Sequence, residues 1–389
     1  MRNTKKAYRG CQIFDGINRH QDCSLLIEGG RVSGIVADTE IPVDYHQVML
    51  SEGLICPGFV DLQVNGGGGV LLNDSPTAQT MQTICDAHLP FGTTSLLPTL
   101  ISDSAVQTGA AIQAAQEAIS EAVSGVLGLH LEGPHLSLAR KGTHAAQFIR
   151  AMEKSDLKNL ISAAAALPSL LLTVAPESVT PSQMAELSAA GAIISLGHSD
   201  AGYAEVSAAV DHGATGITHL FNAMSPLANR EPGVVGAALQ LGTLSAGLIA
   251  DGHHVDATTI GIAMRAKQGP GKIFLVTDAM STIGTDLQEL RLNNRLIKRA
   301  NGRLTLEDGT LAGADLDMIS AVRFMVAKLG ISIDEALQMA SLYPAQLLNR
   351  EHQIGQLIAA SQADFLYLSE DLEINAVWRG GKQKFGNLY

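Results

Sequence analysis

Residues 170–197 read LLLTVAPESVTPSQMAELSAAGAIISLG, and this stretch decides the fold. Two short apolar runs, Leu170–Ala175 and Ala192–Gly197, are typical of buried strands. Between them, Thr180-Pro181 supplies a helix N-cap and first helical position, and Gly191 follows the end of that helix. The stretch therefore predicts strand, helix, strand, which is the repeating unit of a parallel α/β sheet.

The same alternation extends in both directions from this unit, starting at Gly53. Eight strand-like segments are expected, namely Leu54–Val64, Thr93–Pro98, Val126–Glu132, Leu170–Ala175, Ala192–Gly197, Gly216–Leu220, Ser245–Ala250 and Lys272–Thr277. A strand followed by a helix eight times predicts a (β/α)8 TIM barrel. After the last strand we expect a short hairpin over Leu287–Leu306 and two helices over Ala314–Gly330 and Ser332–Ser341.

Both ends of the chain carry short β-type runs instead of this alternation. They are Cys11–Phe14, Ser24–Glu28 and Arg31–Val36 near the start, and Ala363–Leu368 and Ile374–Trp378 near the end. We therefore predict a small β-sandwich domain formed from both termini, residues 1–54 plus 352–389. The barrel would then occupy residues 55–351.

Composition narrows the class of protein. The chain has 389 residues, 46% hydrophobic and 16% charged, with a net charge of -12, which excludes a disordered or coiled-coil chain. An acidic chain disfavours nucleic acid and anionic membrane as partners. Four cysteines without a CxxC pair are typical of reduced thiols, and neither a signal peptide nor a membrane-spanning run is recognised. We therefore expect a cytoplasmic α/β enzyme.

Polar residues cluster at the ends of the predicted strands, where barrel enzymes place their catalytic groups. A single histidine or aspartate at such a position is more often a structural residue or a helix cap. Agreement among six strand ends instead favours a functional site, made from Asp61, Gln63, Asn65, His130, Glu132, His135, His198, His219, Asn222, Asp251, His253, His254 and Asp278.

Three of these residues suggest a metal site. Glu132, His198 and His219 follow three different strands and would converge at the barrel mouth as a His2Glu set, which in catalytic zinc sites leaves one position for water. The metal would lower the pKa of that water towards ~7. Asp278 ends a buried strand and is placed to handle the water proton, since an unpaired buried carboxylate is costly.

Together the motifs resemble the N-acetylglucosamine-6-phosphate deacetylase family of the amidohydrolase superfamily. The resemblance covers nearly the whole chain. It is carried, in order, by Pro57-Gly-Phe-Val-Asp-Leu-Gln-Val-Asn-Gly, Gly128-Leu-His-Leu-Glu-Gly-Pro, Lys141-Gly-Thr-His, Leu196-Gly-His-Ser, Thr218-His-Leu-Phe-Asn-Ala-Met, Arg230-Glu-Pro-Gly, Ile249-Ala-Asp-Gly-His-His-Val, Leu275-Val-Thr-Asp-Ala, Thr310-Leu-Ala-Gly and Leu342-Tyr-Pro-Ala.

The resemblance implies roles for particular residues. Asp278 would be the general base and acid, and His144 would polarise the acetyl carbonyl. The metal would be zinc, with Fe²⁺, Mn²⁺ or Co²⁺ as alternatives. Arg230 and His254 would hold the phosphate, commonly from the partner subunit of a homodimer. Further substrate contacts would come from Asn222, Ala223, Leu311, Ala312 and Gly313.

One departure from the wider superfamily bears on the number of metal ions. Many amidohydrolases carry His-x-His after the first strand, where this chain has Gln63-Val-Asn65. Amide oxygens bind zinc less well than imidazoles do. We therefore predict one tightly bound metal ion per chain. Gln63 would be a further ligand, or Gln63 and Asn65 would bind the metal-bound water or a weakly held second ion. Alternatively, Asn65 would only be a polar residue that closes the barrel mouth.

The sequence thus predicts hydrolysis of the N-acetyl group of N-acetyl-D-glucosamine 6-phosphate by a metal-bound water. The nearest alternative is the N-acetyl-D-galactosamine 6-phosphate epimer, because no motif reads the orientation at C4. Another amidohydrolase reaction or a non-catalytic sugar-phosphate binding protein are more remote alternatives.

Overall fold

Eight parallel strands form the central sheet of the computed structural model, which describes residues 5–293 and 295–387. In sheet order they are β8 (Phe59–Val64), β11 (Thr93–Ile101), β12 (Leu129–Glu132), β13 (Leu170–Val174), β14 (Ile193–Leu196), β15 (Ala214–Ile217), β16 (Ser245–Leu248) and β17 (Ile273–Leu275). Each predicted strand has a counterpart, so the predicted barrel is confirmed. The strands are almost entirely buried because helices cover their outer faces and side chains fill the interior.

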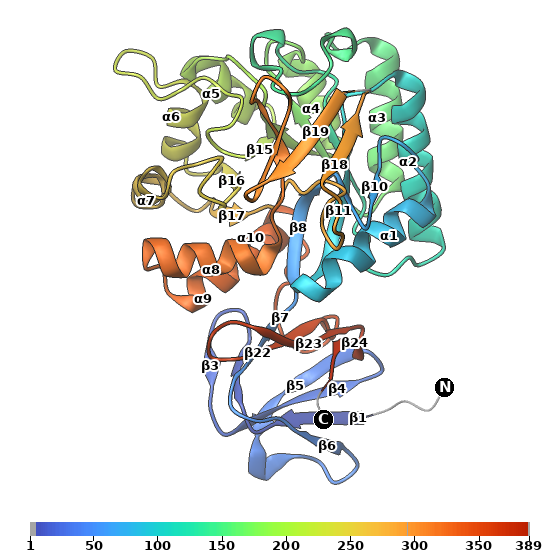
Figure 1. The fold of residues 1–389 in the computed structure, drawn as a ribbon, viewed down its shortest axis with the longest axis vertical. Helices are drawn as coiled ribbons and strands as arrows, with labels where there is room; N and C mark the ends of the chain where they lie inside the picture. Colours follow the sequence, from blue (N-terminus) through green and yellow to red (C-terminus); the bar gives the residue numbers. More distant parts are fainter. Residues whose placement is uncertain (1–4, 294, 388–389) are drawn as a thin grey trace.

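Helices surround the barrel, one after each strand (Figure 1). They are α1 (Ala78–His88), α2 (Ala105–Ser120), α3 (Lys154–Ala166), α4 (Pro181–Ala189), α5 (Tyr203–Asp211), α6 (Gly233–Gln240), α7 (Ala257–Ala266) and α8 (Met318–Leu329), followed by α9 (Ile333–Ala340) and α10 (Leu342–Leu347). The predicted start of α4 is confirmed, since the Thr180 hydroxyl accepts a hydrogen bond from the Gln183 backbone N–H. Among the described residues, no helix is both long and apolar enough to cross a membrane.

The barrel closes between its first and last strands, β8 and β17. The Asp278 backbone N–H donates to the Gln63 carbonyl at 2.9 Å, just beyond β17. Deeper in the seam, the buried Asp61 carboxylate accepts a hydrogen bond from the Thr277 hydroxyl at 2.5 Å. Burial raises the pKa of Asp61 to about 7, although the hydrogen bond from Thr277 opposes this rise. The closure places the polar residues after β17 beside those that follow β8.

The first predicted strand is divided in the structure. We expected one strand over Leu54–Val64, but β7 (Leu54–Pro57) belongs to a different sheet from β8. Pro57 lacks a backbone N–H to continue a ladder. At Gly58 the backbone lies so close to Thr94 that a Cβ would come within 2.2 Å of its hydroxyl oxygen. The chain therefore crosses from one sheet into the other at Pro57-Gly58.

Strands from both ends of the chain pair in the lower part of Figure 1. A six-stranded sheet has the order β24 (Lys382–Gly386), β23 (Ile374–Arg379), β22 (Phe365–Leu368), β7, β2 (Gln12–Phe14) and β3 (Arg19–His20), and a four-stranded sheet has the order β5 (Arg31–Ala37), β4 (Cys23–Glu28), β1 (Lys5–Arg9) and β6 (His46–Met49). Phe365 stacks on Trp378 with ring centroids 4.5 Å apart, and Tyr8 packs edge-on against both rings. The predicted fold class, a barrel with β-sheets from both termini, is confirmed, while the limits at residues 54 and 352 stay predictions.

The expected hairpin after the last barrel strand is larger than predicted. It forms a four-stranded antiparallel sheet of β18 (Glu289–Leu292), β19 (Arg295–Ala300), β20 (Arg303–Thr305) and β21 (Leu311–Ala314). An isolated bridge between Ala279 and Ala314 joins this sheet to the end of the barrel seam. Two short strands, β9 (Gly66–Gly67) and β10 (Val70–Leu71), form a hairpin after β8. The carboxyl end of the barrel is therefore covered by irregular loops and small sheets.

Candidate active site

Three of the predicted ligand side chains meet at the carboxyl end of the barrel. Glu132 ends β12, and His198 and His219 each follow a strand by two residues. Oε1 of Glu132 lies 3.2 Å from His198 Nε2 and 2.9 Å from His219 Nε2, and the two nitrogens are 3.1 Å apart. All three side chains are buried. Within the described residues, this trio forms a cluster whose ligand atoms all lie within 4.8 Å of one another.

The chemistry of this cluster fits a divalent metal ion. Ligand atoms about 2.0–2.2 Å from one tetrahedral ion lie roughly 3.3 Å apart, close to the spacing found here. The His198 Nδ1–H donates to the backbone carbonyl of Arg140 at 2.9 Å, which leaves the Nε2 lone pair free for a metal. Burial would raise the pKa of Glu132, but the His198 and His219 imidazoles beside its Oε1 hold it well below its usual range. An ionised carboxylate and two imidazoles make up a His2Glu donor set.

The backbone is strained where these side chains are presented. His198, His219 and Asp278 have φ angles of 48°, 29° and 51°, in the left-handed region that L residues rarely adopt. Such conformations cost on the order of 1–3 kcal/mol each and persist where the surrounding structure enforces them. Strain at three strand ends aims these side chains into one volume, as is common at functional sites.

Asp278 is connected to the cluster through two amide side chains. The Gln63 Nε2 amide donates to Glu132 Oε1 at 3.0 Å and to Asp278 Oδ1 at 3.1 Å, and Asn65 Nδ2 donates to Asp278 Oδ1 at 2.7 Å. Gln63 is thus a hydrogen-bond donor to both carboxylates, and its role as a metal ligand stays a prediction. Burial and the charge of Glu132 raise the pKa of Asp278 to about 6. A carboxyl with this pKa can exchange protons near neutral pH.

His144 faces the other carboxylate oxygen of the cluster. Its Nε2 lies 3.7 Å from Glu132 Oε2, and its Nδ1 accepts a hydrogen bond from the Ser102 backbone N–H at 3.3 Å. Since a backbone N–H can only donate, Nδ1 carries no proton and Nε2–H points to the cluster. Burial and the neighbouring His198 hold the pKa of His144 well below its usual range. His144 is therefore a neutral donor suited to polarising a carbonyl.

A cavity of about 390 Å³ opens above the cluster. Most of the residues predicted for the site line it, namely Glu132, His144, His198, His219, Asn222, Ala223, His254, Asp278, Leu311 and Gly313. Gln63 lies behind the cavity wall, and Ala312 is fully buried outside it. His254 donates from Nδ1 to Asp251 Oδ2 at 2.6 Å, so Asp251 orients it in the cavity of its own chain. Arg230 does not line this cavity and is exposed on the loop of residues 226–231.

The sequence reasoning missed several lining residues and left others undecided. Asn65, which was predicted for the site, lines the cavity, and so do residues that were not predicted, namely Ile101, Ala139, Arg140, Gly142, Thr143, Ile249 and Thr310. Arg140 could have been predicted to line the cavity because it stands directly before the Lys141-Gly-Thr-His motif.

His130 bridges Thr99 and Thr173 inside the barrel, and burial lowers its pKa to about 4. His253 accepts a hydrogen bond from Arg303, and His135 lies outside the barrel, so none of these three histidines lines the cavity.

This fold and site define a barrel hydrolase with a His/Glu cluster able to hold a metal ion. The model of the amidohydrolase family matches residues 54–384, and the chain belongs to this family. It is 40% identical over 375 residues to N-acetylgalactosamine-6-phosphate deacetylase of Shewanella sp. (strain ANA-3), covering 96% of this chain and 94% of the relative. It is 30% identical over 383 residues to N-acetylglucosamine-6-phosphate deacetylase of Haemophilus influenzae, covering 98% and 99%. The crystal structure of N-acetylglucosamine-6-phosphate deacetylase from Pasteurella multocida superposes with a TM-score of 0.93 at 31% identity, covering 98% of this chain and 99% of that one.

Proposed function

We propose that this chain hydrolyses the N-acetyl group of N-acetyl-D-glucosamine 6-phosphate, giving glucosamine 6-phosphate and acetate. The observation that carries the proposal is the placement of a buried carboxyl, Asp278, and a neutral donor, His144, beside the His2Glu cluster of one cavity. Deacetylase relatives that align along nearly the whole chain support the same reaction.

Glu132, His198 and His219 would hold one divalent ion, with zinc as the first candidate because it suits imidazole and carboxylate ligands. Fe²⁺, Mn²⁺ and Co²⁺ are the alternatives. When bound, the ion supplies Lewis-acid polarisation of the amide carbonyl and a lowered pKa for water. Gln63 Nε2 and Asn65 Nδ2 donate to the Glu132 and Asp278 carboxylates, and neutral amide oxygens bind zinc less well than imidazoles do, which favours a single tight ion. Elemental analysis giving two tightly held ions per chain would overturn the single-ion proposal.

Asp278 handles the proton in the proposed reaction. It accepts a proton from water as the water oxygen forms a bond to the acetyl carbon. It then returns that proton to the sugar nitrogen as the C–N bond breaks, because an unprotonated amine is a poor leaving group. The raised pKa of Asp278, about 6, suits a group that must both take and give a proton. Its hydrogen bonds from Gln63 and Asn65 fix Oδ1 and leave Oδ2 for water.

His144 binds the carbonyl oxygen in the proposed reaction. The Nε2–H of His144 points into the cavity, and negative charge develops on the carbonyl oxygen as water attacks. The bond from Ser102 to Nδ1 fixes both the tautomer and the ring orientation. A donor fixed in this way stabilises the developing charge without first having to reorient.

We propose that His254 and Arg230 hold the substrate phosphate, with Arg230 supplied by the second subunit of a homodimer. His254 lines the cavity, whereas Arg230 lies on an exposed loop away from it in the same chain. Arg230→Ala should raise KM for phosphorylated substrate and leave hydrolysis of N-acetylglucosamine unchanged. Mixing Arg230→Ala with Asp278→Asn chains should restore about a quarter of wild-type activity, since each mixed dimer then has one complete site. No recovery on mixing would contradict a shared site.

A second candidate substrate is N-acetyl-D-galactosamine 6-phosphate. The 40% identity to a relative named N-acetylgalactosamine-6-phosphate deacetylase favours it, and no cavity residue is assigned to the C4 hydroxyl. Measuring kcat/KM for both sugar phosphates in parallel decides between the epimers. Failure to release an amine from either one would point to another amidohydrolase reaction or to a sugar-phosphate binding protein.

Because a sugar phosphate cannot cross a bilayer unaided, we propose a cytoplasmic location.

A further inference from the structure

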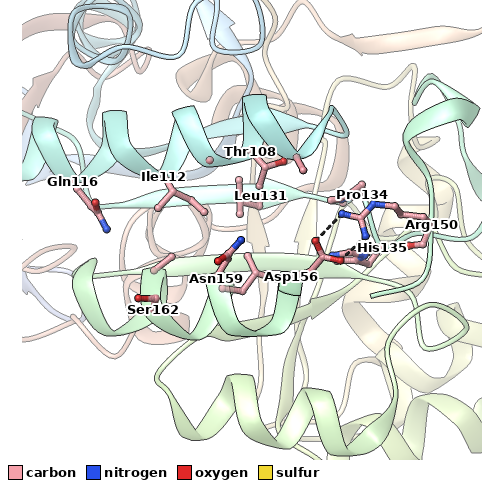
Figure 2. Close-up of a pocket in the computed structure, with 15 residues that line it drawn as sticks. Thr108, Ile112, Gln116, Leu131, Pro134, His135, Arg150, Asp156, Asn159 and Ser162 are labelled. Atoms are coloured by element: carbon pink, nitrogen blue, oxygen red, sulfur yellow. Dashed lines mark hydrogen bonds and ion pairs between the residues drawn. The ribbon is translucent and has the colours of Figure 1, made fainter. Parts of the chain in front are cut away.

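A second cavity of about 330 Å³ lies between helices α2 and α3 on the outside of the barrel (Figure 2). Its floor is Leu131 of β12. Successive strand residues face opposite sides, so Leu131 faces this cleft while Glu132 faces the barrel interior. The cleft is therefore separated from the catalytic cavity by a single strand.

The cleft also borders both ends of the loop that carries His144. This loop spans residues 133–150, and Gly133, Pro134, His135 and Arg150 all line the cleft. The Arg150 backbone N–H donates to the Pro134 carbonyl at 3.2 Å, which closes the base of the loop. A molecule bound in the cleft would thus contact the base of a loop whose middle lines the catalytic cavity.

The buried end of the cleft offers an unpaired hydrogen-bond acceptor. His135 is only 3% exposed and lines the cleft. Its Nδ1 bonds to the Arg150 carbonyl at 3.1 Å, and because a carbonyl can only accept, Nδ1 carries the proton. Burial lowers the pKa of His135, which favours the neutral ring. Its Nε2 lone pair has no partner in the described chain, so a ligand donating an O–H or N–H would satisfy it.

The charges in the cleft cancel one another. Arg150 makes a two-pronged ion pair with Asp156, in which Nη2 lies 2.6 Å from Oδ1 and Nη1 contacts Oδ2 (Figure 2). The Asp156 carboxylate also accepts the Glu153 backbone N–H at 2.9 Å. A phosphate or carboxylate ligand would lie beside the Asp156 carboxylate and be repelled by its charge, which already neutralises Arg150. The cleft therefore favours an uncharged occupant.

Polar groups on the two helices complete the lining. The side chains of Gln116, Asn159 and Ser162 line the cleft and make no hydrogen bond to other described residues. Ile112, next to Gln116 on α2, and Leu131 of β12 supply apolar surface beside these groups (Figure 2). Hydroxyl-rich molecules with an apolar ring face match such a mixture of free polar groups and hydrocarbon.

We propose that the α2–α3 cleft is a second binding site for a small uncharged molecule bearing hydroxyl groups, of the free hexose class. This inference goes beyond the deacetylase function and does not depend on it. Its chemistry differs from that of the catalytic cavity, since it selects against the phosphate that the catalytic cavity is proposed to hold.

Gly109 provides a direct test of the cleft. It lines the cleft on α2, and a Cβ built there meets no atom within 4 Å, so Gly109→Leu would fill the cleft without a clash at its base. Gln113→Leu adds the same side chain to an exposed α2 position outside the cleft and serves as the matched control. His135→Phe keeps a ring but removes the acceptor. Neither leucine variant touches the catalytic cavity, so both should retain turnover.

The probes are D-glucose, D-galactose and glucose 6-phosphate at millimolar concentration, observed by saturation-transfer NMR. We expect transfer to the two free hexoses in wild type and Gln113→Leu, and loss of that transfer in Gly109→Leu and His135→Phe. Transfer to glucose 6-phosphate should be unaffected by Gly109→Leu. Absence of transfer to both hexoses in wild type, or equal transfer in Gly109→Leu, would overturn the proposal.

Discussion

Two cavities of similar size, about 390 and 330 Å³, lie on opposite faces of β12. In the barrel mouth, the carboxylates of Glu132 and Asp278 face imidazoles and amides, and within the described part of the chain none of their hydrogen bonds comes from an arginine or lysine. In the cleft, the charge of Asp156 is paired with Arg150. The volume of a cavity therefore does not distinguish a catalytic site from a binding site. The two cavities differ instead in whether their carboxylates are paired with a cationic side chain.

The difference has consequences for stability as well as for chemistry. Buried carboxylates without a cationic partner raise the free energy of the folded chain until a metal ion or a proton neutralises them. A partly exposed ion pair, in contrast, stabilises the fold only slightly. The same carboxyl-to-amide substitution should thus act in opposite directions on the two sides of β12.

The largest effect should follow loss of a ligand in the barrel mouth. Glu132→Gln keeps the shape of the side chain but removes the charge that binds the ion. We expect loss of bound metal and a fall in turnover of at least about 10⁴-fold, since a metal supplies several kcal/mol to such reactions. Elemental analysis and the rate of acetate release measure the two effects. Retention of metal with near-normal turnover would remove Glu132 from the metal site.

Asp278→Asn should reduce kcat by about 10²–10⁴-fold, because proton transfer is lost while the hydrogen bonds from Gln63 and Asn65 can remain. Metal content and folding, measured by elemental analysis and circular dichroism, should not change. Asp156→Asn is the control with the same chemical change on the other face of β12, and its kcat should stay within about twofold of wild type. Near-normal turnover of Asp278→Asn would mean that another group handles the proton.

In metal-free protein, Asp278→Asn should increase stability at high pH. The folded-state pKa of Asp278 is raised to about 6, so the folded chain holds this proton more tightly than the unfolded chain does. The resulting stabilisation is complete below the unfolded pKa of about 3.9 and is lost as the pH rises through about 6. At pH 8 in chelator, urea unfolding should show the variant more stable by about 1–3 kcal/mol, with the difference vanishing near pH 4. A less stable variant at pH 8 would contradict the inference that the ionised Asp278 carboxylate lacks a cationic partner in the metal-free protein.

The smallest effect concerns the ion pair of the cleft. The hydrogen bond from Arg150 lowers the pKa of Asp156, although burial opposes it. The pair therefore stabilises the fold above the unfolded pKa of about 3.9, and the stabilisation is lost as the pH falls through the lower folded value. Since Arg150 is 36% exposed, Asp156→Asn should destabilise the fold by only about 0.5–1 kcal/mol at pH 7, and less at high salt. A higher free energy of unfolding in the variant would mean that Asp156, like Glu132 and Asp278, lacks an effective cationic partner.

Much of the barrel and of the site could be predicted from the sequence because both rest on local patterns. Apolar runs ending in a polar residue marked the strands, and Glu132, His198 and His219 each stand at such an end. In a parallel barrel the carboxyl ends of all strands lie at one face, so the order of the strands was enough to predict that these residues converge. The break at Pro57-Gly58 was missed, although the proline is a local signal for it because proline interrupts a ladder.

Other features depend on contacts between distant segments and could not be predicted. The bond from Ser102 that fixes the His144 tautomer joins two loops that are 42 residues apart. The cleft exists because α2 and α3 leave room above Leu131, and no sequence motif marks such a gap. Arg230 was assigned from its motif, yet a single chain leaves it outside the cavity. The proposed phosphate role of Arg230 therefore requires the second subunit of the proposed homodimer.

The most direct test of the metal-dependent deacetylase function is acetate release from N-acetyl-D-glucosamine 6-phosphate and its galactose epimer, measured before chelation, after chelation and after adding zinc back. We expect hydrolysis of at least one sugar phosphate, its loss with the metal, and its recovery when about one zinc ion per chain is restored. Undiminished hydrolysis by fully chelated protein, or no hydrolysis of either sugar by zinc-loaded protein, would contradict it.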